Sequence, residues 1–152
     1  MQFDHRFRVA APLSDVRAFH ARSAGMGELT PPPAIVRVHE APELLGEGDT
    51  MRFTIWLGPV PVRWLARIEQ VDDHGFVDRQ LEGPFDSWVH THRFEPDAAD
   101  ATATWVIDRV EAQPSRHPLW GPVAWSMWLT LPLLFRFRAW QTRRLLARQG
   151  AW

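Results

Sequence analysis

Two histidines separated by one residue, His90 and His92, are the residues of this sequence whose types and spacing could do chemistry. If their segment is a β-strand, both imidazoles point to the same face of the sheet. Two acidic residues, Asp78 and Asp108, lie in segments that could form neighbouring strands, and buried polar groups must be paired. We therefore expect an Asp–His network at the base of a pocket.

This network has three interpretations. We favour a structural network that fixes strand register, because satisfied buried polar groups are normal in cores. Alternatively, His90 or His92 hydrogen-bonds a ligand carbonyl or hydroxyl, or acts as a general acid or base while Asp108 or Asp78 orients the ring. A metal site made of the His-x-His pair and a carboxylate is the weakest interpretation. This spacing is common by chance in a strand, so we predict no metal.

The composition excludes several other chemistries. The chain has no cysteine and its 17 basic residues are all arginine, so thiolate and lysine nucleophiles are absent. Ser87 is expected to face away from the histidines, and no glycine-rich phosphate loop follows a strand, so we predict neither a catalytic triad nor a cofactor. The formal net charge of -1 gives no basic excess for binding nucleic acid. Without cysteine or a signal-peptide pattern, a cytoplasmic location is expected.

The spacing of apolar residues predicts a single domain over residues 1–152 that begins with a strand at residues 3–9. A helical spacing follows from Leu13 until Gly25 and Gly27 break it, which predicts one short helix or two broken ones. Alternating segments then predict six antiparallel strands of a meander, at residues 35–39, 51–57, 62–71, 76–81, 86–94 and 102–110. Residues 120–147 predict one long helix, which Pro132 should kink unless a helix begins afresh there.

One helix can cover the apolar face of about seven strands only if the sheet curls around it. We therefore predict an α+β fold in which a curved antiparallel sheet wraps around a long C-terminal helix and leaves a cleft. A packed core is the alternative, since apolar stripes usually mean packing. The candidate wall residues are those on the inward face, namely Met51, Phe53, Ile55, Leu57, Val62, Trp64, Ala66, Ile68, Trp88, His90, His92 and Phe94 from the strands, and Trp128 and Phe135 from the helix.

Several motifs together resemble those of a known superfamily. They are the stretch from Ala11-Pro12 to Thr30-Pro31-Pro32, Asp78-x-Gln80, Gly83-Pro84-Phe85, Trp88-x-His90-x-His92-x-Phe94, Asp108-x-Val110 and the ending Leu134-Phe135-Arg136-Phe137-Arg138. This set resembles the bacterial, polyketide cyclase/dehydrase-like branch of the START/Bet v 1-like superfamily called SRPBCC. The resemblance implies a helix-grip fold with a hydrophobic cavity, and it adds Gln80 to the candidate ligand-binding residues. It transfers function only as a class, which ranges from lipid and hormone binders to cyclases.

Three functions remain open. We favour the binding or carrying of a hydrophobic small molecule, such as a lipid, isoprenoid or polyketide. The alternative is a cyclase or dehydratase in which His90 or His92 is the acid or base and Asp108 orients it. The third is a surface role for the Trp- and Arg-rich C-terminal segment. Because residues 119–135 are barely long enough to span a bilayer and contain two prolines, we expect peripheral membrane contact at most, in a monomer or homodimer.

Overall fold

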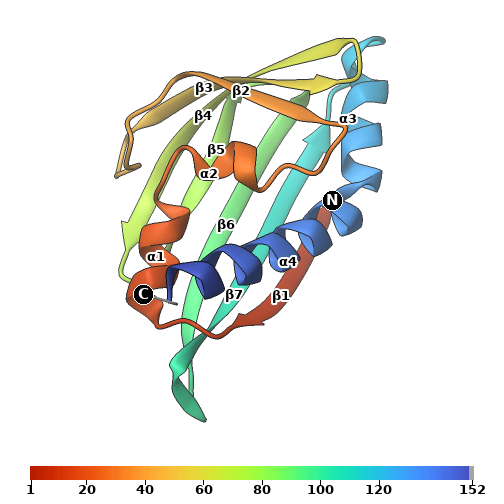
Figure 1. The fold of residues 1–152 in the computed structure, drawn as a ribbon. Helices are drawn as coiled ribbons and strands as arrows, with labels where there is room; N and C mark the ends of the chain where they lie inside the picture. The colour runs from red at the N-terminus through yellow and green to blue at the C-terminus, as the bar shows by residue number, and fades with distance from the viewer. Residues whose placement is uncertain (151–152) are drawn as a thin grey trace.

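An antiparallel sheet of seven strands forms the centre of the computed structural model, which describes residues 1–150. Four helices separate or follow the strands along the chain (Figure 1). The strands are β1 (Gln2–Val9), β2 (Ile35–Glu40), β3 (Thr50–Leu57), β4 (Val60–Asp72), β5 (Gly75–Glu82), β6 (Phe85–Asp97) and β7 (Asp100–Pro114). The helices are α1 (Leu13–His20), α2 (Gly25–Glu28), α3 (Trp120–Leu129) and α4 (Leu131–Gln149). The predicted α+β class is confirmed.

The strand order is β1-β7-β6-β5-β4-β3-β2, so β2 to β7 form the predicted meander and β1 joins its far edge beside β7. Each pair of neighbouring strands is antiparallel. The hairpin of β6 and β7 is longer than the sequence predicted, because Pro96 lies inside β6 instead of starting the turn. Proline is tolerated there because the pairing register shifts between Pro96 and Asp97.

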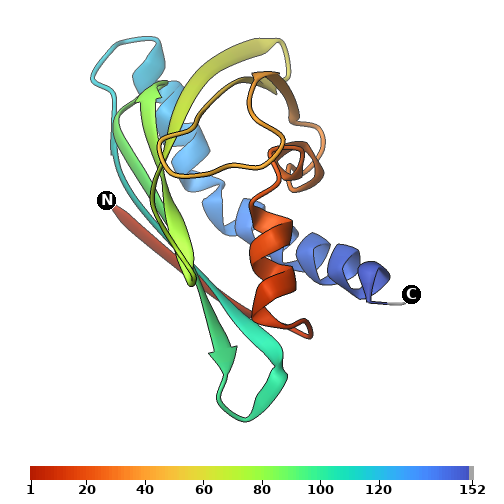
Figure 2. The ribbon, with the colours of Figure 1, turned by 90° about the vertical axis from the view of Figure 1, so that its left-hand side faces the viewer.

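The sheet bends toward its helices. Register shifts interrupt the pairing of β2 with β3, β4 with β5, and β6 with β7, and such bulges increase local bend and twist. Figure 2 shows α1, α2 and α4 on one side of the sheet, with the β2–β4 end curving over toward them. The concave face of the sheet is therefore the face that the helices cover.

The C-terminal segment forms two helices, so the prediction of one long helix is wrong and the stated alternative, a fresh start at Pro132, is confirmed. Helix α3 ends at Leu129, and Pro132 occupies the first turn of α4. Proline has no amide hydrogen and its ring excludes the carbonyl four residues earlier, so it fits only in a first turn. Thr130 lies at the junction, where its hydroxyl donates to the carbonyls of Ser126 and Met127 at 3.1 and 2.9 Å. Within residues 1–150, neither helix is long and apolar enough to cross a membrane.

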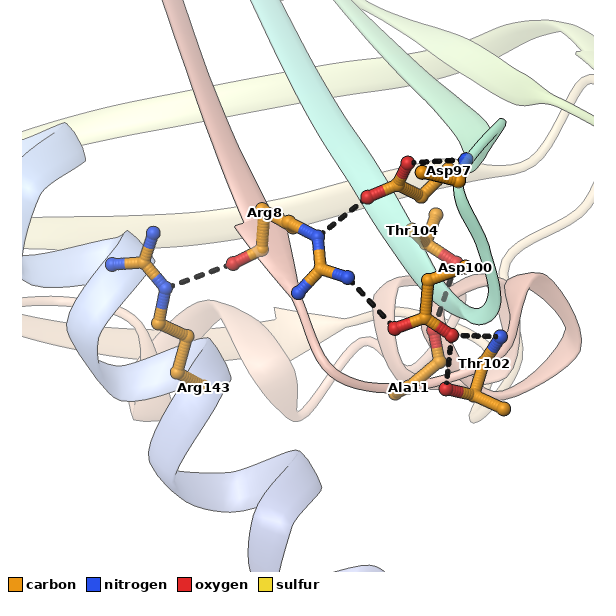
Figure 3. Close-up of polar contacts among 8 residues, drawn as sticks. Arg8, Ala11, Asp97, Asp100, Thr102, Thr104 and Arg143 are labelled. Carbon is orange, nitrogen blue, oxygen red and sulfur yellow. Dashed lines mark hydrogen bonds and ion pairs between the residues drawn. The ribbon is translucent and has the colours of Figure 1, made fainter.

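Ionic contacts fix the edge strand β1 to the hairpin of β6 and β7 and to helix α4 (Figure 3). Arg8 Nε donates to Asp97 at 2.6 Å, and its Nη2 donates to Asp100 at 2.8 Å. From the helix, Arg143 Nε donates to the backbone carbonyl of Arg8 at 2.9 Å. Each contact joins segments far apart in sequence: Arg8 links β1 to the hairpin of β6 and β7, and Arg143 links α4 to β1.

Candidate functional site

A cavity of about 570 Å³ lies between the concave face of the sheet and the helices. Its walls come from four parts of the chain: the central strands, the end of α1 with α2, the proline segment 31–33, and the first two turns of α4. The surface is mainly apolar, with polar groups gathered where β5 and β6 face α4. The structure therefore has a cavity between the sheet and the helices, as predicted, and the alternative of a solidly packed core does not apply here.

Most of the wall residues named from the sequence line this cavity. They are Met51, Phe53, Ile55, Leu57, Trp64, Ile68, Trp88, His90, His92 and Phe135, together with the acidic candidate Asp78. All of them lie on the inward side of a strand or of α4. Alternation in the strands and helical spacing in α4 predicted this side from the sequence. Their role in binding a ligand stays a prediction.

Five other candidates lie elsewhere. Gln80 is engaged by the turn between β5 and β6, where its Nε2 donates to the Phe85 carbonyl at 2.7 Å. Phe94 is buried against α1 in a separate apolar cluster. Val62 and Ala66 are fully buried in strand β4 and add no surface to the cavity, and Trp128 of α3 packs on the core from outside it. We therefore remove these five from the cavity wall.

The predicted Asp–His network is present on the concave face. Strand register places His90 opposite Asp78 on β5, and places His92 opposite Asp108 on β7. His90 Nε2 donates to Asp108 Oδ1 at 2.9 Å. His92 Nδ1 lies 3.2 Å from the same oxygen but is not aligned for a hydrogen bond. Asp108 is buried behind the two rings and does not line the cavity, whereas Asp78 does.

Burial determines the charges in this network. Burial opposes ionisation of Asp108, but the His90 hydrogen bond and the nearby His92 ring outweigh it and lower its pKa well below the usual range. Burial lowers the pKa of His90 despite the Asp108 carboxylate, and lowers that of His92 to about 4. Asp108 is therefore a carboxylate that faces neutral imidazoles. Because His90 donates from Nε2, its Nδ1 is left as the acceptor.

Asp78 has the opposite behaviour. Burial raises the pKa of Asp78, although the His92 ring and Arg138 act in the other direction. Its Oδ1 atom is shielded from solvent and has no hydrogen-bond partner in residues 1–150. A carboxyl group that is easily protonated and unpaired can donate a proton or a hydrogen bond to a bound molecule.

Several polar wall residues were missed by the sequence analysis, and two of them, His20 and Arg138, lie near the Asp–His network. His20 ends α1, where its Nδ1 donates to the Val16 carbonyl at 2.8 Å, and burial lowers its pKa to about 4. Arg138 lies on α4 and lines the cavity although most arginines of that helix are exposed. The helical spacing Leu131, Phe135, Arg138 was available as a signal, but the residue type suggested a solvent-facing side chain.

Asp78, His90 and His92 could also act as ligands for a metal, since one ligand atom from each lies within 4.8 Å of the others. Asp108 would then be a carboxylate behind both imidazoles, as is common in metal sites. Two observations argue against a metal. Burial favours the neutral form of Asp78, and the Arg138 guanidinium interacts with Asp78 as a competing cation. The donor set therefore fits a metal poorly.

Solved structures with similar folds were found for the whole chain. The Zhui aromatase/cyclase from Streptomyces sp. R1128 is 18% identical, with a TM-score of 0.76 over 99% of this chain and 95% of that one. Norcoclaurine synthase from Thalictrum flavum, in complex with dopamine and hydroxybenzaldehyde, is 18% identical, with a TM-score of 0.70 over 97% of this chain and 87% of that one. Protein NE0264 from Nitrosomonas europaea is 11% identical, with a TM-score of 0.72 over 100% and 97%.

The chain has the same helix-grip fold as these structures. The resemblance carried by the motifs around residues 83–94 is thus confirmed at the level of the fold. No protein-family model matches the sequence, and no curated protein matches it either. At these identities the similarity establishes the fold, while the activity must be argued from the cavity itself.

Proposed function

We propose that this helix-grip protein binds a hydrophobic small molecule in the cavity between its sheet and helix α4. The observation that carries the proposal is the mainly apolar cavity of about 570 Å³, which is open on one side and lies within the usual range of ligand pockets. Such a volume bordered by Phe, Trp, Met and Pro side chains favours an apolar occupant, because its binding removes apolar surface from water on both sides.

The aromatic wall supports a preformed pocket. Trp64 lies edge-on to Trp88 with ring centroids 5.4 Å apart and parallel to Phe53 at 6.0 Å. All three are buried, so their rings are held by neighbours when the cavity is empty. A wall that is already ordered loses little conformational entropy on binding, which favours affinity.

Native mass spectrometry of untreated protein tests the proposal directly, because a copurified ligand would appear as an adduct. Titration with the neutral dye N-phenyl-1-naphthylamine tests it with a known probe. Val36 lines the cavity from strand β2, and its neighbour Arg37 points to the opposite face. We expect Val36→Trp to fill the cavity and abolish dye binding, while Arg37→Trp leaves it unchanged. Equal binding by wild type and both variants would show that the dye binds elsewhere and would refute the proposal.

A cyclase- or dehydratase-type enzyme is the second candidate. It is favoured by His90, which both lines the cavity and is oriented by the buried Asp108 carboxylate through its Nε2. This leaves the neutral Nδ1 as a base, within a wall that also holds the easily protonated Asp78. Two proteins of similar fold are an aromatase/cyclase and a norcoclaurine synthase.

Catalysis can be tested without knowing the substrate. A general base in the cavity would accelerate exchange of the α-protons of a small aryl ketone such as acetophenone with D₂O, which proton NMR measures. We expect His90→Ala to remove the acceleration while the thermal midpoint changes little. A large loss of stability in both His90→Ala and His92→Ala, without any exchange activity in wild type, would assign the network to structure alone.

A further inference from the structure

Arg138 is a partly buried cation in the cavity wall that forms no ion pair within residues 1–150. It lines the cavity from the second turn of α4, and its Nε is shielded from solvent without a hydrogen-bond partner in residues 1–150. Among the same residues it forms no ion pair, although most of the other arginines do or are exposed. An unpaired charge in such a place is costly unless another group compensates it.

The acidic groups near Arg138 are not paired with it. Asp78 and Asp108 attract the guanidinium, but neither forms a hydrogen bond or an ion pair with it within residues 1–150, and Asp108 accepts from His90 instead. Asp78 is itself unpaired, and burial favours its neutral form. The imidazoles of His20 and His90 are neutral near pH 7, because burial lowers the pKa of both. The Nε–H donor of Arg138 is therefore left without an acceptor in the cavity wall.

We propose that Arg138 is the binding site for an anionic group, and that the occupant of the cavity is an amphipathic anion with a carboxylate head and an apolar tail. This inference rests on the proposed binding function and names its ligand class. A guanidinium presents paired N–H donors that match the two oxygens of a carboxylate, and this match is strongest away from water. Burial favours the protonated form of Asp78, and that form can donate a further hydrogen bond to the same head.

The tail of such a ligand would lie against the apolar part of the wall. Arg138 is near Asp78 and His20, and most of the other side chains that line the cavity are apolar. The cation also sits over the Phe135 ring, with Cζ 5.3 Å from the centroid, which fixes its position before a ligand arrives.

The experiment compares decanoate with 1-decanol, which differ in head group and share their tail, by displacement of N-phenyl-1-naphthylamine at pH 7.5. Wild type is expected to bind decanoate at least about ten-fold more tightly, because charge-assisted hydrogen bonds are about twice as strong as neutral ones. Arg138→Met should remove this preference, because it removes the cation and keeps an unbranched side chain in the cavity wall. Arg138→Lys should keep part of it, and Arg136→Met, which alters an exposed arginine of the same helix, should keep all of it.

The outcomes separate this inference from the proposed function. Equal affinity of wild type for the two ligands would overturn the role of Arg138 while leaving the apolar pocket intact. Failure of the dye and of both ligands to bind would overturn both proposals. If Arg138→Met does not fold, the wild-type preference and its partial retention in Arg138→Lys still decide the question.

A second, independent feature is the segregation of charge along the chain. All 18 acidic residues lie at or before Glu111, and the remaining residues 112–152 contain six arginines and no acid. Five of these arginines are exposed, the exception being Arg138. The same segment exposes large apolar side chains, with 72% of Leu129, 67% of Leu133 and 52% of Trp140 accessible.

We infer that this C-terminal surface docks on an anionic lipid bilayer. Apolar side chains that enter the interface and arginines that face anionic head groups are the two elements of peripheral binding. An apolar side chain and an arginine lie together at Trp140, because Cζ of Arg144 lies over the Trp140 ring, 5.3 Å from its centroid. The surface also adjoins the cavity, since Leu133 is both exposed and part of the cavity wall. A docked protein would therefore hold its cavity close to the membrane.

Cosedimentation with vesicles tests the surface. Vesicles of phosphatidylcholine with about one third phosphatidylglycerol should bind the protein, pure phosphatidylcholine should bind it weakly, and added salt should release it. The double variant Leu129→Ser with Leu133→Ser should reduce binding about five-fold or more. The control Ile35→Ser removes an equally exposed side chain from β2 and should bind as wild type does. No binding to the anionic vesicles, or equal binding by both variants, would overturn the inference.

Discussion

Acidification from pH 7 to pH 4 should destabilise the folded protein, because it protonates histidines that are buried as neutral rings. His20 and His92 both line the cavity, and burial lowers the pKa of each from 6.5 to about 4. The ring of His20 is packed 4.8 Å from that of Phe94, and the His92 ring stacks on Phe76 at 4.4 Å. These contacts hold both imidazoles among aromatic side chains, where the charged form is disfavoured.

The sign and size follow from linkage. Between pH 6.5 and pH 4 the unfolded chain binds protons at these histidines and the folded chain does not, so the free energy of unfolding falls as the pH falls. For one ring the loss is about 2 kcal/mol at pH 5 and about 3 kcal/mol at pH 4. Burial lowers the pKa of His90 and of His5, which adds to the trend, whereas the raised pKa of Asp78 opposes it.

Urea denaturation followed by tryptophan fluorescence measures this effect at pH 7, 6, 5 and 4, and the nine tryptophans give a strong signal. His20→Phe keeps a ring of similar shape and removes one titrating group. We expect its free energy of unfolding to fall by about 2 kcal/mol less than that of wild type between pH 7 and pH 5. His74→Phe changes an exposed turn residue and should follow wild type.

Two results would refute this reasoning. The first is a wild-type free energy of unfolding that stays constant down to pH 4.5, which would mean that the buried rings are protonated without cost. The second is a His20→Phe variant that loses as much stability as wild type. The urea dependence must keep the same slope at each pH, because a change in slope would signal a different denatured state.

Three further changes test the packing and the network by the same denaturation assay. Phe135→Ala should cost about 3–5 kcal/mol because the ring is buried between α4 and the sheet, whereas Leu133→Ala, on the exposed side, should cost under about 1 kcal/mol. Gly75→Ala should be strongly destabilising because a Cβ atom there would clash with the backbone of β6. Gly48→Ala is its control: Gly48 also has a positive φ but faces open space, so this variant should lose only about 1 kcal/mol of the free energy of unfolding. Asp108→Asn should cost about 1–2 kcal/mol at pH 7, because a charged acceptor becomes neutral. Since the pKa of Asp108 is lowered in the folded state, this difference should shrink below about pH 3.8 and not at higher pH.

Much of the fold could be predicted from local patterns. Alternation at residues 86–94 assigned His90, His92 and Trp88 to one face of a strand, and the structure has all three on the concave face. The turn residues between the strands predicted the meander, because short connections permit only antiparallel pairing. The prolines at 31–33 and Pro132 predicted where helices cannot continue. The simplest interpretation of residues 120–147 nevertheless joined α3 and α4 into one helix.

The misplaced candidates share a physical cause. Phe94 continues the alternation of Trp88 and His92, but the sheet bends and twists, so its end packs on α1 in place of the cavity. Gln80 follows Asp78 at the right spacing, yet its amide satisfies the Phe85 carbonyl at a turn. Period-two spacing fixes the face of a side chain and does not fix which helix lies over that face.

The sequence by itself determined the residue types and their alternation, and these decide which side chains face inward. Only the tertiary structure decided that the inward side chains leave a space of about 570 Å³, and that Arg138 faces this space. The physical reason is that cavity volume depends on the distance between α4 and the sheet. Contacts between distant residues, such as Arg143 with the Arg8 carbonyl, join α4 to the sheet, and no local spacing encodes them.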